Sequence, residues 1–530
     1  MLRLALLLAL GRSRGLGGLL WAALGLGLTA CIFHTVQIRA IGSNADSLDI
    51  ETPVKAHLRD GSTVLYPDGV LLARDTLRGP GVRYGLTLRD STDVSLEPVD
   101  SVVALESFRT RVDAGPTAIV STLAAGALLA GVVGLGWLIF AATCGSCQSS
   151  PIVYADSAGT WRLQGEGFSY TLGSAFERRD VTRLAIRPDQ DGRIRLQVRN
   201  EAAETEYFNL LELLEVRHAA DETVLPDQTG AALALRELVP AATIADAGGR
   251  DLRLFLSGPG SAGFRTDART LARASPGNLD DAIYLVAPAP AAGDSVALVL
   301  RLRNSLLATL LYSEVMVGSR GAGSLDWVAR DLDGEGAAVA RWQEERMGMQ
   351  VAIWDGRRYR QTARIRDSGP HAWKDVAVLI PVVQRDSVRV RLSFPDDNWR
   401  IEGAVFAVQA RRPVVRTLPF SRLFDAAGHD DSSALASVRL ADQRYLRTSP
   451  GERFTVVAEA GTAAAELGRT FLLATQGYYE PWIGRDGLHA ARDSPAAESL
   501  DARLLRAIRK WRTVREARER AFAPERSPEQ

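Results

Sequence analysis

The fold class of this sequence is decided by residues 193–199, which read RIRLQVR and follow the turn sequence DQDG at 189–192. Polar and apolar side chains alternate through the stretch, and a period of two residues is typical of a strand with one buried face. Asp and Gly are favoured in the tight turns that join neighbouring strands. Residues 193–199 therefore predict a strand that enters from a turn and buries every second side chain.

The same pattern continues on both sides of this strand. Further strand candidates lie at 152–154, 161–163, 210–216, 252–256, 296–302, 349–354, 376–381, 387–394, 399–406 and 469–479. Short strands separated by turn residues favour sandwiches over a parallel α/β sheet. A chain of 530 residues is also too long for a single core. We therefore predict a mainly β, multidomain protein with β-sandwich and jelly-roll-like domains.

Changes in the pattern along the chain predict the domain boundaries. Five strand candidates around an Asp-Gly turn suggest a small SH3- or Sm-like barrel, and helical spacing marks the C-terminal end, where Leu500, Leu504, Ile508, Trp511 and Arg515 share one face. The predicted units are an anchor at 1–40, the small barrel at 41–115, an apolar helix of transmembrane type at 116–143, a β-sandwich at 150–304, a helical interlude at 305–347, a jelly-roll-like block at 348–410, a β region at 411–490 and a C-terminal helix at 495–523.

Composition excludes several classes of function. The 63 basic and 63 acidic residues cancel, and no basic stripe is evident, which argues against binding to nucleic acid. Cysteine occurs only at Cys31, Cys144 and Cys147, so a disulfide framework or a tetrahedral zinc site lacks residues to build it. No dinucleotide fingerprint and no phosphate-binding glycine loop is present. The sequence predicts no cofactor and no metal.

Two apolar segments predict attachment to a membrane. Three arginines precede an uncharged run at 15–30, which is the pattern of an export signal. The run at 116–143 has no charge and exceeds the roughly 20 apolar residues that cross a bilayer. The alternatives are an uncleaved signal anchor extending to Ile38 and, for 116–143, a buried helical hairpin. We expect a membrane-anchored protein of the bacterial cell envelope.

The end of the first apolar run suggests a lipid anchor. Residues 28–31 read LTAC and resemble the lipobox of bacterial lipoproteins. That resemblance implies cleavage before Cys31 and a diacylglyceryl group on its thiol, which would make membrane lipid a direct partner.

The chain as a whole resembles an uncharacterised family of bacterial envelope proteins that resemble lipoproteins. The shared order is a lipobox, a small β-barrel, an apolar helix and a β-sandwich region that begins at a cysteine. The resemblance depends on residues 146–147 (SC), 153–154 (VY), 165–168 (GEGF), 176–180 (FERRD), Asn200, Glu201, Glu204, Thr205 and Tyr207. This chain has Gln148 where the family usually has proline. The resemblance implies this architecture and no particular chemistry.

Candidate chemistry is sparse, and we predict no catalytic residues. The sequence contains no GxSxG and no HExxH motif. Oxygen ligands cluster at 200–209, where calcium is one interpretation and a solvated loop or capping network is the other. His429 stands among aspartates in what reads as an exposed turn. The jelly-roll-like block carries Trp354, Trp373 and Trp399, which we take as candidate ligand contacts.

Three functional hypotheses follow from these features. The first is a non-catalytic, membrane-anchored envelope protein whose β domains mediate protein contacts or assembly. The second is a glycan-binding envelope protein that uses Trp354, Trp373 and Trp399. The third is a hydrolase, which would need a cleft with paired, partly buried carboxylates. Other envelope proteins or glycans are the expected partners.

Lipidation of Cys31 can be tested directly. We expect the mature chain to begin at Cys31 and to carry a diacylglyceryl group on the thiol, because LTAC follows a basic and then apolar leader. Mass spectrometry of the N-terminal peptide measures this modification. A chain that starts at Met1, or an unmodified Cys31, would contradict the prediction.

Overall fold

The computed structural model divides the chain into two units, 1–46 and 47–530, and every residue that it describes belongs to the second. The described residues are 47–73, 75–85, 91–107, 150–157, 159–290, 294–317, 323–330, 335–384, 386–462, 467–484 and 498–522. Cys31 and the apolar run at 116–143 lie outside them. In these ranges, no helix is both long enough and apolar enough to span a membrane.

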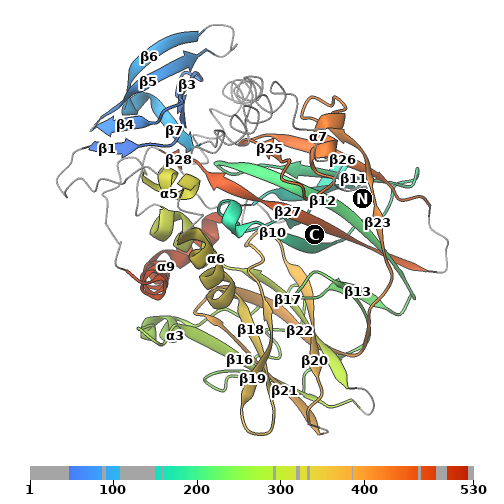
Figure 1. The fold of residues 1–530 in the computed structure, drawn as a ribbon. Coiled ribbons are helices and arrows are strands. Elements are labelled where there is room, and N and C mark those ends of the chain that lie inside the picture. Colours follow the sequence, from blue (N-terminus) through green and yellow to red (C-terminus); the bar gives the residue numbers. More distant parts are fainter. Residues whose placement is uncertain are drawn as a thin grey trace, which may run out of the picture. The chain divides into compact units, whose positions relative to one another are not determined.

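The prediction of a mainly β protein is confirmed, because the described residues form five multi-stranded sheets (Figure 1). Four of these sheets pair into two sandwiches, and the fifth is a small sheet near the N-terminal end of the described chain. Every strand pair within the sheets is antiparallel, as expected for short strands joined by turns.

The first sandwich packs two five-stranded sheets face to face. One of them, the β11 sheet, has the order β24-β26-β11-β8-β9. Its strands are β8 (Ile152–Ser157), β9 (Thr160–Glu166), β11 (Arg193–Arg199), β24 (Phe420–Phe424) and β26 (Arg453–Glu459). The other, the β12 sheet, has the order β10-β27-β12-β23, with β25 also paired to β12. Its strands are β10 (Arg178–Leu184), β12 (Glu204–His218), β23 (Val415–Leu418), β25 (Leu446–Thr448) and β27 (Gly468–Pro481).

The alternating stretch at 193–199 lies at the centre of the β11 sheet. Ile194, Leu196 and Val198 are at most 2% exposed and pack into the core between the two sheets. Phe208 and Phe471 reach this core from the β12 sheet. The period of two residues in the sequence thus corresponds to one face against the core and one face away from it.

The second sandwich has the same plan. Its β17 sheet has the order β13-β14-β22-β17-β20, and its β21 sheet has the order β15-β16-β21-β18-β19. The strands of the β17 sheet are β13 (Thr223–Pro226), β14 (Ala232–Pro240), β17 (Ser295–Asn304), β20 (Lys374–Pro381) and β22 (Trp399–Arg411). The strands of the β21 sheet are β15 (Thr243–Asp246), β16 (Asp280–Pro288), β18 (Met349–Trp354), β19 (Tyr359–Ile365) and β21 (Ser387–Pro395). Leucines, isoleucines and valines from both sheets form one core.

The structure divides the strands differently from the predicted ranges 150–304, 348–410 and 411–490. All strands from β13 to β22 belong to the second sandwich, and in the sequence they lie between β12 and β23 of the first. The first sandwich therefore takes its strands from the two segments that flank the second sandwich in the sequence, and the second is inserted into it. Pattern along the chain marks strands well, but it carries no information on which distant strands pair.

The β13–β14 hairpin lies between the two sandwiches and is apolar on both faces. Val224, Ala232 and Ala234 pack with Leu214 and Leu472 of the β12 sheet, among other residues. The alternate positions, Leu225, Leu233 and Leu235, pack instead with Ala297, Ala377 and Ala407, which lie on the other strands of the same β17 sheet. The hairpin thus joins the two sandwiches by burying one face against each.

The small sheet contains eight strands in the described residues. Its order is β1-β4-β5-β3-β2-β7-β28, with β6 also paired to β5. The strands are β1 (Ser47–Ile50), β2 (Val54–Leu58), β3 (Thr63–Tyr66), β4 (Val70–Ala73), β5 (Thr76–Tyr84), β6 (Ser91–Pro98), β7 (Val102–Ser107) and β28 (Ile483–Gly484), with the short helix η1 (Val99–Ser101) before β7. Seven strands come from the range predicted as a barrel, where five were expected, and β28 comes from the C-terminal part.

Helices share a core with the small sheet. They are η2 (Ser174–Phe176), α3 (Ala268–Arg273), α4 (Leu307–Leu310), η3 (Leu311–Val317), α5 (Ser324–Arg330), α6 (Glu335–Arg346) and α9 (Leu500–Phe522), while α7 (Ser432–Ser437) packs into the core of the first sandwich. On α9, Leu504, Ile508 and Trp511 are fully buried. These residues belong to the predicted helix face at 500–515, and they pack with Leu307 of α4.

A buried aspartate fixes the position of α9. Asp397 is 0% exposed and lies in the turn before β22. Its carboxylate accepts hydrogen bonds from Trp511 Nε1 at 2.7 Å and from Arg515 Nη1 at 3.3 Å, both on α9. It also accepts from Arg400 Nη1 at 2.7 Å. Charge-assisted bonds of this kind are stronger than neutral ones, so the C-terminal helix is held against the edge of the second sandwich.

Asp396, next to Asp397 in the sequence, has a carboxyl group with a raised pKa. Burial, reinforced by the carboxylates of Asp281, Asp280 and Asp397, raises the pKa of Asp396 to about 7. The side chain is 2% exposed, so water does little to stabilise its charge.

We expect Asp396 to make stability depend on pH. The folded protein holds this proton up to about pH 7, whereas an unfolded chain releases it near pH 4, so ionisation opposes folding between these values. The free energy of unfolding should fall as pH rises from about 4 to about 7. Asp396→Asn removes the titration, and its stability relative to the parent should grow by up to about 4 kcal/mol over that range. Urea unfolding at several pH values measures this, and parallel curves for the two proteins would contradict it.

Candidate functional site

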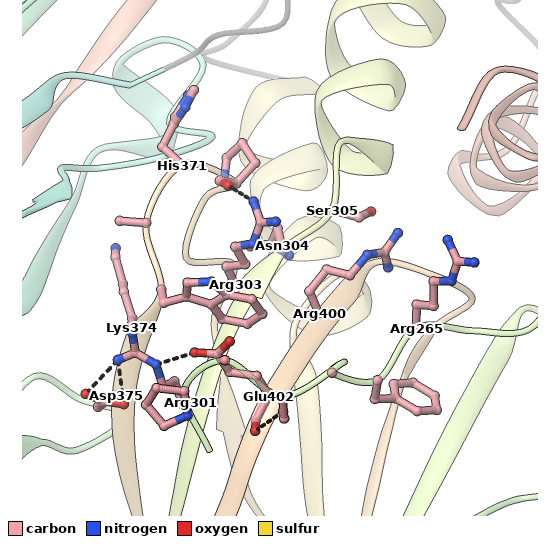
Figure 2. A pocket seen from close by; sticks show the side chains of 18 of the residues that line it. Arg265, Arg301, Arg303, Asn304, Ser305, His371, Lys374, Asp375, Arg400 and Glu402 are labelled. Atoms are coloured by element: carbon pink, nitrogen blue, oxygen red, sulfur yellow. Dashed lines mark hydrogen bonds and ion pairs between the residues drawn. The ribbon is translucent and has the colours of Figure 1, made fainter. Parts of the chain in front are cut away.

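A groove of about 1390 Å³ is lined by residues of both sandwiches, and we call it the basic groove. The first sandwich contributes residues of β9 and β10 to its lining, and the second contributes β17, the start of β20 and the start of β22. The loop at 259–265 and the end of α9, at Glu519 and Phe522, complete the walls. Figure 2 shows the side chains of 18 of the residues that line it.

Strand β17 forms one wall because its two faces differ in chemistry. Leu300 and Leu302 are fully buried in the core of the second sandwich. Arg301 and Arg303 alternate with them and line the groove. In the register with β22, Arg303 is directly opposite Arg400, so two guanidinium groups face each other across neighbouring strands. Like charges in this position destabilise a sheet unless other groups offset them.

Arg301 and Arg400 are both neutralised by carboxylates. Arg301 Nε donates to Glu402 Oε1 at 2.5 Å, and its Nη1 donates to Asp375 Oδ2 at 3.2 Å (Figure 2). Arg400 Nη2 donates to Glu519 Oε1 at 2.5 Å in addition to its bonds with Asp397. These two arginines therefore act as structural ties between β17, β20, β22 and α9.

Arg303 is held differently, without a carboxylate. Its Nη1 donates to the carbonyl oxygen of Pro370 at 2.6 Å, and its guanidinium lies 4.9 Å from the centre of the Trp373 ring. Burial and the facing Arg400 lower the pKa of Arg303 from its ordinary value. The cation–π contact and one backbone acceptor orient the group.

Asn304, at the end of β17, fixes the loop that carries Pro370 and Trp373. Asn304 is 0% exposed. Its Oδ1 accepts hydrogen bonds from the backbone N–H groups of Ser368 at 2.6 Å and Gly369 at 3.0 Å, and its Nδ2 donates to Asp367 Oδ1 at 2.9 Å. A buried amide with its donors and acceptors satisfied specifies one loop conformation.

Glu166 fixes the same loop from the first sandwich. Its Oε1 accepts from the backbone N–H groups of His371 at 2.8 Å and Ala372 at 3.1 Å. Burial raises the pKa of Glu166, while the charge of Lys374 and these hydrogen bonds act in the opposite direction. Gly369 has φ of +85°, and a Cβ there would lie 2.2 Å from Glu166 Cδ. The loop therefore needs glycine at this position, and it joins the two sandwiches at the groove.

The structure separates the three candidate tryptophans. Trp373 lines the groove. Trp399 is 0% exposed and packs in the core of the second sandwich, where it cannot contact a ligand. Trp354 is half-buried at the end of β18, with its ring 5.2 Å from that of Tyr359, and it does not line the groove. The three side chains do not form a common aromatic surface.

The oxygen-rich stretch at 200–209 is not a solvated loop. Asn200, Glu204 and Glu206 are at most 2% exposed, so that interpretation is wrong for them. Asn200 Nδ2 donates to two backbone carbonyl groups, as the capping interpretation predicts. Burial raises the pKa of Glu204 and of Glu206 well above the usual range. Among the described residues, no group of three or more His, Cys, Asp or Glu side chains is arranged to hold a metal ion.

The carboxylates of the groove are engaged in ion pairs. Asp375 and Glu402 both hold Arg301, and Glu519 holds Arg400. These ion pairs tie β20, β22 and α9 to the arginines of β17 and β22 around the groove.

Sequence reasoning missed the arginines that line the groove. Arg301 falls within the predicted strand at 296–302 and Arg303 directly after it, and neither was predicted to be a site residue. The available signal was the unequal pattern along β17, where Ala297 and Val299 give way to Arg301 and Arg303 on one face. That change marks the point at which an apolar contact ends and a polar space begins. Arg400 and Glu519 come from distant segments and gave no local signal.

Comparison with known proteins does not identify the chain. No protein-family model and no curated protein matches the sequence. Among solved structures, it is similar to a GH31 alpha-xylosidase from Xanthomonas citri, with 9% identity, a TM-score of 0.17 and coverage of 82% of this chain and 38% of that chain. It is also similar to a chain of the Sulfolobus turreted icosahedral virus, with 7% identity, a TM-score of 0.12 and coverage of 62% and 89%. At these TM-scores neither likeness supports an argument about fold or function.

The two arginines of β17 should differ in their contribution to stability. Arg301→Met leaves Asp375 and Glu402 without their shared partner and should lower the free energy of unfolding by about 1–3 kcal/mol. Arg303→Met removes a cation that has no carboxylate partner and faces Arg400, so its effect should stay within about 1 kcal/mol. Urea unfolding of the two variants makes the comparison. An equal loss in both would show that Arg303 is a structural residue.

Proposed function

We propose that this chain is a non-catalytic glycan-binding protein of a bacterial cell envelope and that the basic groove is its binding site. The observation that carries the proposal is the lining of the groove. Trp373 and several arginines line it, while each of its three carboxylates is paired with arginine. Aromatic rings and planar guanidinium groups are suited to the ring faces and polar edges of sugars.

The size of the groove also favours an extended ligand. Small-molecule sites are typically about 300–1,000 Å³, and this groove has about 1390 Å³. Its walls come from segments between Leu163 and Phe522, and buried Asn304 and Glu166 hold the loop that carries Trp373. A site fixed in this way loses little entropy when it binds a ligand.

The proposed location depends on the sequence features at the N-terminus. The lipobox-like LTAC at 28–31 and the apolar run at 116–143 would attach the chain to a membrane, with lipid on Cys31. The resemblance to an envelope family of lipoprotein type points to the same compartment. A binding protein at this surface would meet envelope glycans as its most abundant extended ligands.

We prefer this function to the two other hypotheses for specific reasons. Contacts between proteins commonly use broad surfaces of about 800 Å² on each partner, whereas this site is concave. A hydrolase would need a carboxylate free to donate a proton, and Asp375, Glu402 and Glu519 are all committed to arginine.

The two tryptophans outside the core provide a matched test of the site. Oligosaccharides prepared by partial hydrolysis of a bacterial envelope polysaccharide should bind the full-length protein in detergent. Trp373→Ala should weaken this binding about tenfold or more, because it removes an aromatic contact from the groove. Trp354→Ala, at a partly exposed position outside the groove, should leave it unchanged. Isothermal titration calorimetry measures the affinities, with chromatography of the recovered sugars as a check on cleavage. Equal affinities in both variants, or cleaved sugars, would contradict the proposal.

A further inference from the structure

The groove concentrates positive charge in a protein whose formal charges cancel. Seven basic side chains line it and only three carboxylates do. The basic residues are Arg183, Arg250, Arg265, Arg301, Arg303, Lys374 and Arg400, and the acidic ones are Asp375, Glu402 and Glu519. A concave site lined by one sign of charge attracts ligands of the other sign.

Most of these basic residues have an acidic partner. Arg183 lies 3.9 Å from Asp375, Arg250 lies 2.9 Å from Asp246, and Arg265 lies 3.8 Å from Glu519. Arg301 and Arg400 form the closer pairs described above. The charge of Lys374 acts on buried Glu166 and counters the effect of burial on that carboxyl group.

Arg303 differs from the other five arginines that line the groove, each of which has a carboxylate oxygen within 4 Å, although the charges of Glu166, Glu519 and Glu402 act on it from farther away. Within the described part of the chain, no carboxylate oxygen lies within 4 Å of its guanidinium nitrogens, and its Nε is buried without a hydrogen-bond partner. Its one hydrogen bond runs from Nη1 to Pro370 O. A buried cation without a counter-ion is costly, and here it also faces Arg400 across the sheet. An anion from outside the chain that paired with Arg303 would offset this cost.

The unused edge of the guanidinium indicates what would fit. With Nη1 taken, Nε and Nη2 remain, and these two groups form the edge that binds carboxylate or phosphate through two parallel hydrogen bonds. The protein contains this arrangement elsewhere. Arg411 uses Nε and Nη2 to bind both oxygens of Glu222, at 2.7 and 2.6 Å.

We propose that Arg303 forms an anion subsite in the basic groove and binds a carboxylate or phosphate group carried by an acidic glycan. The inference rests on the proposed function and specifies the ligand class. Trp373 supports the guanidinium from one side, and Pro370 O sets its rotation. Asn304 and Glu166 hold the loop from which both contacts come, so the subsite exists before the ligand arrives.

Three probes and three variants test the subsite in the full-length protein. The probes are a short oligogalacturonate, its methyl-esterified form, which lacks the charges, and an oligosaccharide ending in mannose 6-phosphate. The variants are Arg303→Gln, Arg303→Lys and, as a control, Arg422→Gln, which removes an exposed arginine of β24 that pairs with Asp430 and lies outside the groove. Calorimetry gives the affinities at two salt concentrations, and thermal melting confirms that each variant is folded.

We expect the acidic probes to bind more tightly than the ester and to weaken with salt. Arg303→Gln should reduce the affinity for the acidic probe about 10- to 100-fold and leave that for the ester unchanged. Arg303→Lys keeps the charge but lacks the paired donors, so it should recover part of the loss, and Arg422→Gln should behave as the parent. The comparison of galacturonate with mannose 6-phosphate decides whether carboxylate or phosphate is preferred.

Two other outcomes would overturn the subsite, and they can be told apart. If the ester binds as tightly as the acid, or if Arg303→Gln binds the acidic probes as the parent does, the subsite is wrong while a glycan groove stands. If the parent binds none of these probes and none of the envelope oligosaccharides, the subsite and the proposed function fail together.

Discussion

The structure depends on a hairpin that must be covered on both faces. Strands β13 and β14 present small and medium-sized apolar side chains alternately to two sides, and exposure of either set would cost the free energy of burying it. One face packs on the β12 sheet, and the other packs with Ala297, Ala377 and Ala407 of the other strands of the β17 sheet. The hairpin therefore connects the two sandwiches. Farther along β17, Arg301 and Arg303 take the place of Ala297 and Val299, and they line the basic groove.

Buried polar groups then determine the shape of the groove. Asp397, Asn304 and Glu166 are each at most 2% exposed, and each bonds to segments that are far from it in the sequence. Such groups are favourable only when their hydrogen bonds are formed, so the loss of one partner leaves a buried polar group unsatisfied. These hydrogen bonds fix two parts of the groove wall, the loop with Trp373 and the end of α9. Among the arginines that line the groove in the described residues, Arg303 alone lacks a carboxylate oxygen within 4 Å.

Much of the local structure was visible in the sequence. The alternation at 193–199 predicted a strand with Ile194, Leu196 and Val198 inside, and the spacing at 500–515 predicted the buried face of α9. Both predictions succeed because a period of two or of 3.6 residues reports directly on which side chains share a face. The pairing of β11 with β26 could not be predicted, since the periodicity of one strand says nothing about its neighbour.

The same limit explains the candidate site. Trp399 begins a predicted strand, and we expected it to contact a ligand. In the structure its side chain lies on the face of β22 that packs into the core of the second sandwich. Arg303, Trp373, Arg400 and Glu519 meet only after four distant segments are assembled. Composition also concealed the groove, because a chain with no net charge can still collect basic residues on one surface. The charge of a site depends on the fold, whereas the charge of a chain does not.

The insertion of one sandwich into the other has a consequence for the order of folding. The second sandwich consists of strands β13 to β22, which follow one another in the sequence. All its residues are therefore present as soon as synthesis of the chain has reached Arg411. At that moment β24, β26 and β27 of the first sandwich have not been made. Strand β11 then lacks its partner β26, and strand β12 lacks its partner β27. Unpaired edges are templates for association with other chains. The pairing of Arg199 with Arg453 closes a long segment of chain, and contacts of this kind slow folding, so the first sandwich should form after the second.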